Sequence, residues 1–318
     1  MRNTQGSKSN ITVSIIVPFF NEEQNLPLFT QVLSKVLESL TYNWEVLLID
    51  NCSTDESSNF ARDLAKKDVR IKYIRFSRNF GPSVEASISA GYRLCRGDAA
   101  IVIYSDLQDP PELIVTFIEK WEEGYDVVYG LQTTRLGEPR WRKFSVKLFY
   151  YLLDKLSDAN PIPANAGDFR LISRNVIEVV NQLPERSRYT RGLIAWAGFK
   201  TTGIEYEREP RRQGKSKANF FSILALSLTA VTSFSLKPLR ILTGFGIFVV
   251  LLSIIMSIFY LISFFTGETI PGLTTIILIL LFSLGLNMGA LGLLGEYIGR
   301  INIETKQRPL YVIDEVIN

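Results

Sequence analysis

Histidine is absent from the 318 residues of this sequence, and cysteine occurs only twice. The absence of histidine excludes acid–base catalysis by imidazole and any zinc site with imidazole ligands. Cys52 and Cys95 cannot form a four-thiolate metal site or a CxxC pair, and they indicate thiols in a reducing compartment. Carboxylates, hydroxyls, lysine and arginine must therefore carry any chemistry.

The net charge is also small, and the common nucleotide-binding motifs are absent. The 35 Lys and Arg residues nearly balance the 32 Asp and Glu residues, which leaves a net charge of +3 and no charged tail. This balance argues against nucleic acid as a partner. No GxGxxG follows the first apolar run and no GxxxxGK[ST] occurs, so the chain is neither a standard dinucleotide binder nor a P-loop enzyme.

Two long uncharged runs occupy the C-terminal third, Ile241–Phe265 with 25 residues and Leu273–Leu294 with 22. Each is long enough to cross a hydrocarbon core of about 30 Å as a helix. Lys and Arg flank the outer ends of the pair, which places both termini in the cytoplasm and predicts a multi-pass inner-membrane protein. The alternative is a pair of buried helices in a soluble core. GxxxG spacings at Gly285–Gly289 and Gly295–Gly299 permit a homo-oligomer through the transmembrane and juxtamembrane helices, with helix flexibility as the alternative.

The first 130 residues alternate short apolar runs with segments of helical spacing. The runs predict strands over 13–20, 44–50, 71–77, 99–106 and 125–130, and the spacing predicts helices over 21–40, 53–66 and 83–95. The predicted fold class is α/β, with a mostly parallel sheet covered by helices on both faces. Amphipathic juxtamembrane helices and a C-terminal two-helix transmembrane hairpin complete it.

The same patterns predict the domain boundaries. Residues 1–10 are a polar tail, 11–219 a cytoplasmic catalytic domain and 220–240 a juxtamembrane helix. The hairpin covers 241–299, and 300–318 form a cytoplasmic tail. A further amphipathic stretch, 144–156, lies either in the membrane interface or against the sheet.

Polar side chains follow the predicted parallel strands, where ligands bind in such sheets. Asp106 and Gln108 follow one strand, and a carboxylate there can hold a divalent metal through oxygen ligands. The alternative for Asp106 is a cap on the next helix. Asp50 ends another strand and can accept a hydrogen bond from a base or ribose, or instead form an Asx-turn.

Two basic clusters suit phosphate groups. The segment 211–217 combines four cations with a glycine, and it binds either donor phosphates or anionic lipid. The second cluster precedes the amphipathic stretch and suits a lipid phosphate, with solvated surface charge as the alternative: Arg135, Arg140, Arg142 and Lys143.

Several segments together resemble a known family. PFFNEE, IDNCSTD, SRNFGP, SDLQDPPE, GDFRLISR, LPERSRYTRGLIAWAGF and RRQGKSK occur in the order found in the polyprenyl-phosphate glycosyltransferases of the inverting glycosyltransferase family 2. The resemblance covers roughly residues 11–310. It implies a metal-dependent hexosyltransferase with a nucleotide-diphospho-sugar donor, Mg²⁺ or Mn²⁺ as cofactor, and a membrane-embedded polyprenyl phosphate acceptor.

The resemblance also implies residue roles. Asp106 and Asp168 are the implied catalytic residues, with Asp106 and Gln108 at the metal and diphosphate. An ion pair with Arg170 or Arg174 is the structural alternative for Asp168. The implied nucleotide-sugar-binding residues are Pro18, Phe20, Glu22, Asp50, Gln108, Arg211 and Lys217.

Three departures from the family pattern bear on these roles. Tyr104 occupies the first position of the usual DxDLQ, so metal binding depends on Asp106. Asn51 and Cys52 replace the Asp and Gly of DDGS, and the loss of glycine is expected to limit positive φ there. Ala218 stands where an aromatic residue usually follows GxSK.

Transfer of glucose from UDP-glucose to undecaprenyl phosphate is the favoured reaction, because the whole pattern with the C-terminal hairpin resembles bactoprenol glucosyltransferases. The alternatives are a GDP-mannose-dependent polyprenyl-phosphate mannose synthase and a non-catalytic membrane-anchored nucleotide-sugar binder. A processive polysaccharide synthase is less consistent with two spans and with the lack of QxxRW after Gln182.

Overall fold

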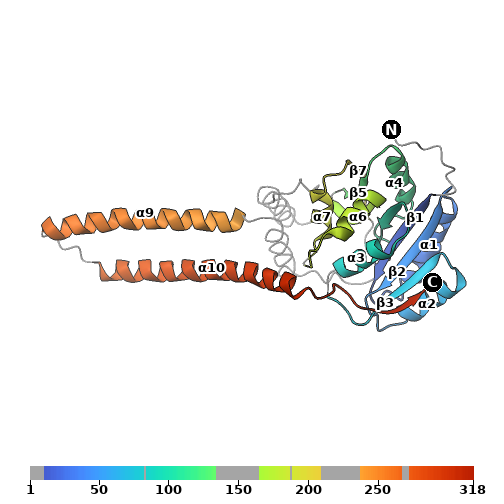
Figure 1. The fold of residues 1–318 in the computed structure, drawn as a ribbon, viewed down its shortest axis with the longest axis horizontal. Coiled ribbons are helices and arrows are strands. Elements are labelled where there is room, and N and C mark those ends of the chain that lie inside the picture. The colour runs from blue at the N-terminus through green and yellow to red at the C-terminus, as the bar shows by residue number, and fades with distance from the viewer. Residues whose placement is uncertain (1–10, 82–83, 134–164, 187, 209–236, 267–271) are drawn as a thin grey trace.

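The structure, a computed structural model, describes residues 11–81, 84–133, 165–186, 188–208, 237–266 and 272–318. These residues form an α/β domain from which two long helices project (Figure 1). Several predicted features lie outside the described residues: Arg135, Arg140, Arg142, Lys143, Arg211, Lys217, Ala218 and the stretches 144–156 and 220–234.

The first half of the chain alternates strands and helices, as the apolar patterns predict. Its strands are β1 (Thr12–Phe19), β2 (Asn43–Asp50), β3 (Ile71–Phe76) and β4 (Ala99–Val102), and they pair in parallel in the order β4-β1-β2-β3. Its helices are α1 (Leu26–Glu38), α2 (Ser57–Lys67), α3 (Glu85–Leu94) and α4 (Leu113–Glu122).

Element ends differ from the predictions beside the parallel strands. Helix α1 begins at Leu26 rather than at residue 21, and α2 begins at Ser57 rather than at residue 53. Strand β4 ends at Val102, so Asp106 lies in a loop four residues beyond it. Before α1 and α2, the residues form hydrogen bonds between the β1 and β2 loops instead of continuing a helix. After β4, the Gln108 amide donates to the Asp106 carboxylate within one loop instead of continuing the strand.

The second half of the domain makes the sheet mixed, which corrects the mostly parallel prediction. Strand β6 (Ala166–Ser173) pairs antiparallel with both β4 and β5 (Val127–Gln132), and β7 (Thr201–Tyr206) pairs parallel with β5. Two helices, α6 (Arg174–Gln182) and α7 (Thr190–Trp196), connect β6 with β7. The full order is β7-β5-β6-β4-β1-β2-β3-β8.

The last strand, β8 (Ile313–Ile317), corrects the predicted C-terminal tail. It pairs antiparallel with β3 and closes an edge that would otherwise expose unpaired backbone groups. The side chain of Arg62 on α2 contacts Glu315 at 2.9 Å and fastens this strand. The chain therefore returns from the projecting helices to the sheet (Figure 1).

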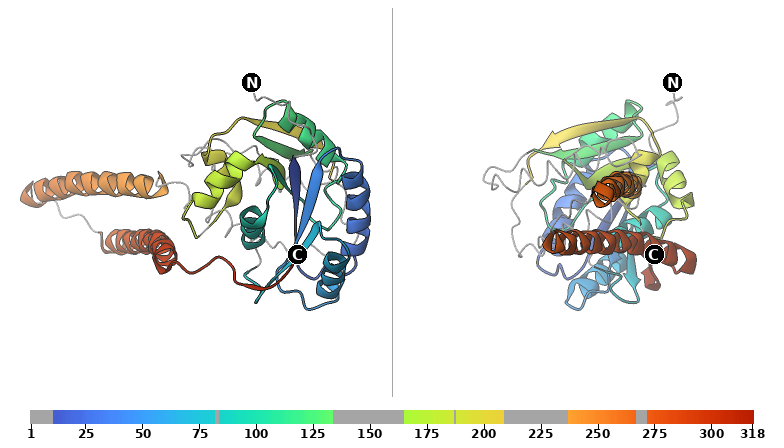
Figure 2. Two further views of the ribbon diagram at one scale, coloured as in Figure 1. Left: turned by 45° about the vertical axis from the view of Figure 1, so that its right-hand side comes forward. Right: turned by 90° about the vertical axis from the view of Figure 1, so that its left-hand side faces the viewer.

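Helices cover both faces of the sheet, as predicted (Figure 2). Helices α1, α2 and α4 pack on one face through residues such as Phe29 and Phe117, while α3, α6 and α7 pack on the other through Ile88 and Ile177. Gly91 of α3 lies so near Ile16 of β1 that a Cβ atom there would overlap it. Burial of these apolar side chains is the main stabilising contribution to the domain.

The two predicted uncharged runs form the helices α9 (Lys237–Thr266) and α10 (Leu273–Lys306), which confirms their helical character. Both extend away from the sheet on the side of α3, α6 and α7 (Figures 1 and 2). Within the described residues, no helix is sufficiently long and apolar to cross a membrane.

Candidate active site

The loops at the carboxyl ends of β1, β2 and β4 share an unusual backbone feature. Asn21, Cys52 and Leu107 have φ values of 55°, 65° and 56°. Such left-handed conformations are unfavourable for residues with a Cβ atom and occur often at functional sites. Cys52 adopts this conformation despite the missing glycine, so the expected limit on positive φ is wrong. We infer that the rim of the parallel strands is held in a specific shape.

Hydrogen bonds between the first two loops maintain that shape. The amide of Asn21 donates to the Ser53 hydroxyl at 3.0 Å, and the amide of Thr54 donates to the Asn21 side chain at 2.8 Å. The amide of Glu22 donates to the hydroxyl of Ser57 at 2.8 Å, at the start of α2. The predicted nucleotide-binding loop of β1 therefore has its backbone bound to the loop of β2.

The predicted nucleotide-binding residues of β1 differ in accessibility. Pro18 is buried within the strand, opposite Ile49 of β2. Phe20 and Glu22 are partly exposed beyond the strand end, and the Glu22 carboxylate accepts a hydrogen bond from Asn25 at 2.7 Å. Phe20 and Glu22 are thus the two of this group that lie where a ligand can reach them.

Asp50 is fully buried, and its hydrogen bonds stabilise the loop that follows β2. Its carboxylate accepts hydrogen bonds from the Ser53 amide at 2.7 Å, the Ser58 hydroxyl at 2.5 Å and the Tyr73 hydroxyl at 2.9 Å. Arg75 lies 3.8 Å away. This geometry favours the Asx-turn alternative over contact with a nucleotide, because the carboxylate faces protein donors on all these sides.

The loop after β4 presents its first carboxylate outward and its second inward. Asp106 is partly exposed, and it accepts the Gln108 amide at 3.2 Å, while the Gln108 side chain is buried. Asp109 is 2% exposed, accepts the hydroxyl of Tyr206 at 2.5 Å and pairs with Arg208 at 3.2 Å. Burial raises the pKa of Asp109, although the Arg208 charge and the Tyr206 hydrogen bond oppose that rise.

Asp168 lies at the start of β6 in a buried polar cluster. Both of its oxygens face Arg191, at 2.6 and 2.7 Å, and Arg170 approaches to 3.4 Å. Tyr104 donates its hydroxyl at 2.7 Å, so the residue at the first position of DxDLQ binds Asp168 directly. Burial alone raises the pKa of Asp168, but the Arg191 charge and hydrogen bonds, the Arg170 charge and the Tyr104 hydrogen bond hold it below its ordinary value.

This cluster changes the interpretation of Asp168. The alternative ion pair with Arg170 is confirmed, but Arg174 instead donates to the Gly97 carbonyl at 2.9 Å. The principal partner is Arg191, which lies within a family motif but at no local spacing that would indicate this role. A carboxylate with two bound cations is a weak base, so the geometry favours a positioning role for Asp168 over proton transfer.

Glu85 connects this cluster to α3. Its carboxylate accepts hydrogen bonds from the amide and the hydroxyl of Thr190, the residue before Arg191. Burial raises the pKa of Glu85, and the Asp168 charge raises it further. The start of α3 therefore positions the start of α7, and no local sequence pattern indicates this contact because 105 residues separate its partners.

The described residues offer few protein ligands for a metal ion. Among the described residues, no three acidic or thiol side chains form a group that could hold a metal. Asp106 supplies one carboxylate with Gln108 beside it in the same loop. Mg²⁺ commonly binds one or two carboxylates and completes its coordination with substrate phosphates, so this donor set fits such an ion.

The chain belongs to glycosyl transferase family 2, whose profile matches residues 14–180. The family predicted from the motifs is thereby confirmed.

Relatives extend the match over nearly the whole chain. An uncharacterized glycosyltransferase, YkcC of Bacillus subtilis, is 41% identical over 310 residues, covering 96% of this chain and 94% of its own. The bactoprenol glucosyl transferase of Shigella phage SfV is 38% identical over 302 residues, covering 95% and 97%. A prophage bactoprenol glucosyl transferase homolog of Escherichia coli is 38% identical over 305 residues, covering 96% and 99%.

Proposed function

We propose that this glycosyltransferase transfers a sugar from a nucleotide-diphospho-sugar to a membrane polyprenyl phosphate, with glucose and UDP-glucose as the favoured sugar and donor. The observation that carries the proposal is the full-length similarity to relatives named bactoprenol glucosyl transferase. The strained, hydrogen-bonded loops beyond β1, β2 and β4 supply a preformed rim for the donor. GDP-mannose is the alternative donor.

The proposed reaction is an in-line displacement at the anomeric carbon. An oxygen of the acceptor phosphate forms the new bond to this carbon as the bond to the nucleotide diphosphate breaks on the opposite face, which inverts the configuration. A phosphate oxygen is already anionic near neutral pH, so no strong general base is required. This requirement suits a chain without histidine and an Asp168 that is bound to Arg191.

Asp106 and Gln108 would hold the divalent cation, Mg²⁺ or Mn²⁺, at the donor diphosphate. Such an ion would offset the negative charge that develops on the leaving diphosphate. Arg211 and Lys217 are proposed to contact the same phosphates. Asp168 and Arg191 are proposed to position the sugar, because their paired charges are fixed next to the β4 loop through Tyr104.

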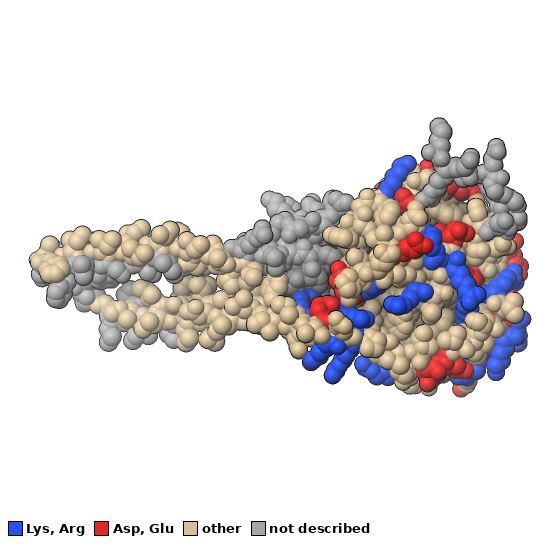
Figure 3. Space-filling view, in the orientation of Figure 1, with Lys and Arg blue, Asp and Glu red and all other residues tan. Residues whose placement is uncertain are grey.

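We further propose that α9 and α10 attach the enzyme to the inner membrane, with both termini in the cytoplasm. Large apolar side chains on both helices are exposed, among them Ile255 at 63% and Phe282 at 69%. Figure 3 shows no charged side chain on the described hairpin away from the domain, and Lys and Arg gather where the hairpin meets the domain. Exposed apolar surfaces of this kind mark membrane or protein contacts.

The proposed topology is tested by cysteine labelling. A cysteine at Thr269, introduced with Cys52 and Cys95 replaced, should react with an impermeant reagent added to intact cells. A matched cysteine at Asp63, on the exposed side of α2, should react only after lysis. Labelling at Asp63 in intact cells would contradict both the topology and the use of a cytoplasmic donor.

Turnover is tested with membranes and a panel of labelled nucleotide sugars, with the lipid product identified by mass. Asp106→Asn should reduce turnover below about a tenth of the parent at saturating Mg²⁺ or Mn²⁺ because a charged oxygen ligand is lost. Asp63→Asn, an exposed carboxylate on α2, is the matched control and should retain activity. Donor binding without any product would identify the non-catalytic binder that the Tyr104 departure suggests.

The acceptor site is assigned to the basic cluster before residue 144. Replacing Arg140 and Arg142 with alanine should raise the KM for polyprenyl phosphate roughly tenfold or more, because two charge-assisted phosphate contacts are lost. The KM for the nucleotide sugar should change little. An increase in the donor KM alone would assign the cluster to the donor.

A further inference from the structure

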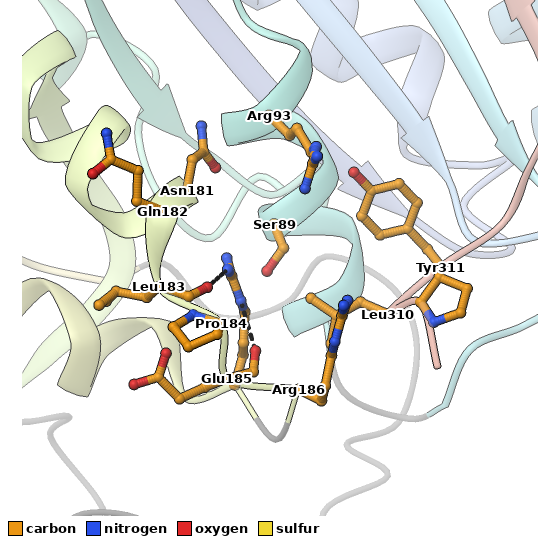
Figure 4. A pocket seen from close by; sticks show the side chains of 12 residues that line it. Ser89, Arg93, Asn181, Gln182, Leu183, Pro184, Glu185, Arg186, Leu310 and Tyr311 are labelled. Carbon is orange, nitrogen blue, oxygen red and sulfur yellow. Dashed lines mark hydrogen bonds between the residues drawn. The ribbon is translucent and has the colours of Figure 1, made fainter. Parts of the chain in front are cut away.

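A cavity of about 470 Å³ lies on the α3 face of the sheet, away from the strand-end loops. Its walls are α3, the segment that follows α6, and the segment Pro309–Tyr311 that follows α10 (Figure 4). None of the loops beyond β1, β2 and β4 contributes to it. The cavity is therefore separate from the proposed donor site.

Three arginines line this cavity: Arg93, Arg186 and Arg188. Among the described residues, neither the Arg93 nor the Arg186 side chain has a hydrogen-bond acceptor or an ion pair. Arg188 donates to the carbonyls of Leu183 at 2.7 Å and Glu185 at 3.1 Å, which holds it in place. The cluster thus combines one fixed guanidinium with two that lack a partner in the described part of the chain.

The acidic groups nearby leave the cluster cationic. Glu185 is the one carboxylate among the described lining residues, and in Figure 4 it points away from Ser89 and Arg93. Glu304 of α10 accepts the backbone amide of Arg186 at 2.8 and 2.9 Å. Burial lowers the pKa of Arg188, Glu185 and Tyr311 oppose that fall, and the positive charges of Arg186 and Arg93 add to it.

A buried hydroxyl is also without a partner. Ser89 is 3% exposed, and its Oγ atom has no hydrogen-bond partner within the described part of the chain. Figure 4 shows this hydroxyl directed into the space between α3 and the Leu183–Arg186 segment. A buried polar group of this kind ordinarily has a partner, so the unmet hydroxyl indicates a ligand with acceptor atoms.

We propose that this cavity binds a phosphate-bearing anion through Arg93, Arg186 and Arg188, with Ser89 donating to a phosphate oxygen. Arginine forks match phosphate oxygens in geometry and charge. The source is either an anionic lipid headgroup or a soluble phosphate ester. Pro309 is three residues beyond the end of α10, within about 10 Å along the chain, which puts the cavity near the membrane surface if the proposed attachment holds.

The site also has a route to the catalytic cluster. The segment that carries Arg186 and Arg188 leads directly into α7, where Thr190 binds Glu85 and Arg191 binds Asp168. An anion that orders this segment would hold Arg191 in its observed position. The anion is therefore expected to stabilise the chain, and it is not a donor or an acceptor of the reaction.

The test uses the full chain in a neutral detergent. Native mass spectrometry counts bound phosphatidylglycerol against phosphatidylcholine, and a thermal shift at constant ionic strength measures inorganic phosphate. The variant R93Q/R186Q removes the two unpartnered cations, and R96Q/K67Q removes two exposed cations elsewhere as the matched control. Ser89→Ala provides a milder variant, and circular dichroism verifies folding of each.

We expect anion affinity to fall at least tenfold in R93Q/R186Q, about two- to tenfold in Ser89→Ala, and little in the control. Preference for phosphatidylglycerol identifies a lipid headgroup, whereas a phosphate-induced shift without lipid preference identifies a soluble ester. Equal affinity in the parent and R93Q/R186Q, or an equal loss in the control, would overturn the proposal. Glycosyl transfer is measured separately in the control variant. If the control retains glycosyl transfer, the proposed function holds whether or not the cavity binds an anion.

Discussion

Replacing Arg191 with glutamine would remove the main cation that faces the buried carboxylate of Asp168. The Asp168 side chain is 10% exposed and that of Arg191 is 26% exposed, so water compensates only part of the loss. Removing one partner of a buried ion pair costs about 3–5 kcal/mol. Arg170 and Tyr104 remain in place, so we expect the lower end of that range, about 3 kcal/mol.

This loss corresponds to a measurable shift in melting temperature. At about 2–4 °C per kcal/mol for a domain of this size, Arg191→Gln should melt about 6–12 °C below the parent. Far-ultraviolet circular dichroism of the full chain in detergent measures the shift. Arg70→Gln breaks an exposed pair with Asp68 and is the matched control, with an expected loss below about 1 kcal/mol.

A double variant tests whether the lost stability comes from the interaction between Asp168 and Arg191. In Asp168→Asn/Arg191→Gln both charges of the pair are removed and Arg170 remains, so the combined loss should be smaller than the sum of the single losses by about 1–3 kcal/mol. Additive losses would show that the two side chains act independently. A melting temperature of Arg191→Gln within about 2 °C of the parent would refute a stabilising ion pair.

The pH dependence gives an independent measurement. The folded-state pKa of Asp168 is held below the ordinary value, which is about 3.9 in an unfolded chain. The stabilisation is therefore present above about pH 4 and is lost as the pH falls toward the lower folded-state pKa. The difference in melting temperature between the parent and Asp168→Asn should be constant from pH 5 to 8 and should narrow below pH 4.

Three further predictions concern other described residues. Cys52→Gly should raise stability by up to about 1 kcal/mol, because relief of a left-handed conformation worth about 1–2 kcal/mol exceeds the entropy cost of glycine; a lower melting temperature would show that the Cys52 side chain stabilises the loop. Burial raises the pKa of the Cys95 thiol to about 11, so iodoacetamide at pH 8 should alkylate Cys52 at least tenfold faster than Cys95, and equal rates by peptide mass spectrometry would refute this packing. Tyr206→Phe removes the hydroxyl that binds buried Asp109 and should cost about 1.5–3 kcal/mol in thermal unfolding, whereas no change would assign Asp109 to Arg208 alone.

Local sequence patterns were sufficient to predict the strands and helices of the parallel half of the sheet. Strands β1 to β3 are short, predominantly apolar runs, and α1 to α3 have helical spacing, so each element is encoded within about fifteen neighbouring residues. The same locality explains why the polar loops beyond these strands could be identified as a candidate site. The positions at which α1 and α2 begin were missed, because hydrogen bonds between two separate loops determine them.

The partners of buried polar groups could not be read from the sequence. Asp50 could equally be exposed to a nucleotide or buried, and only its contacts with Ser58 and Tyr73 decide between them. Asp168 is paired with Arg191, 23 residues away and on a different element. No local spacing relates these residues, so their electrostatic coupling exists only once β6 and α7 are packed together.

The family, the apolar patterns and the strand-end carboxylates can be read from the sequence, because each depends on residue identity or on short-range periodicity. The antiparallel insertion of β6, the return of β8 to the sheet and the assembly of the arginine-lined cavity emerge only when the chain is folded. These features join segments that are distant in the chain, such as Arg62 with Glu315. Their stability comes from burial and from pairing that no local pattern contains.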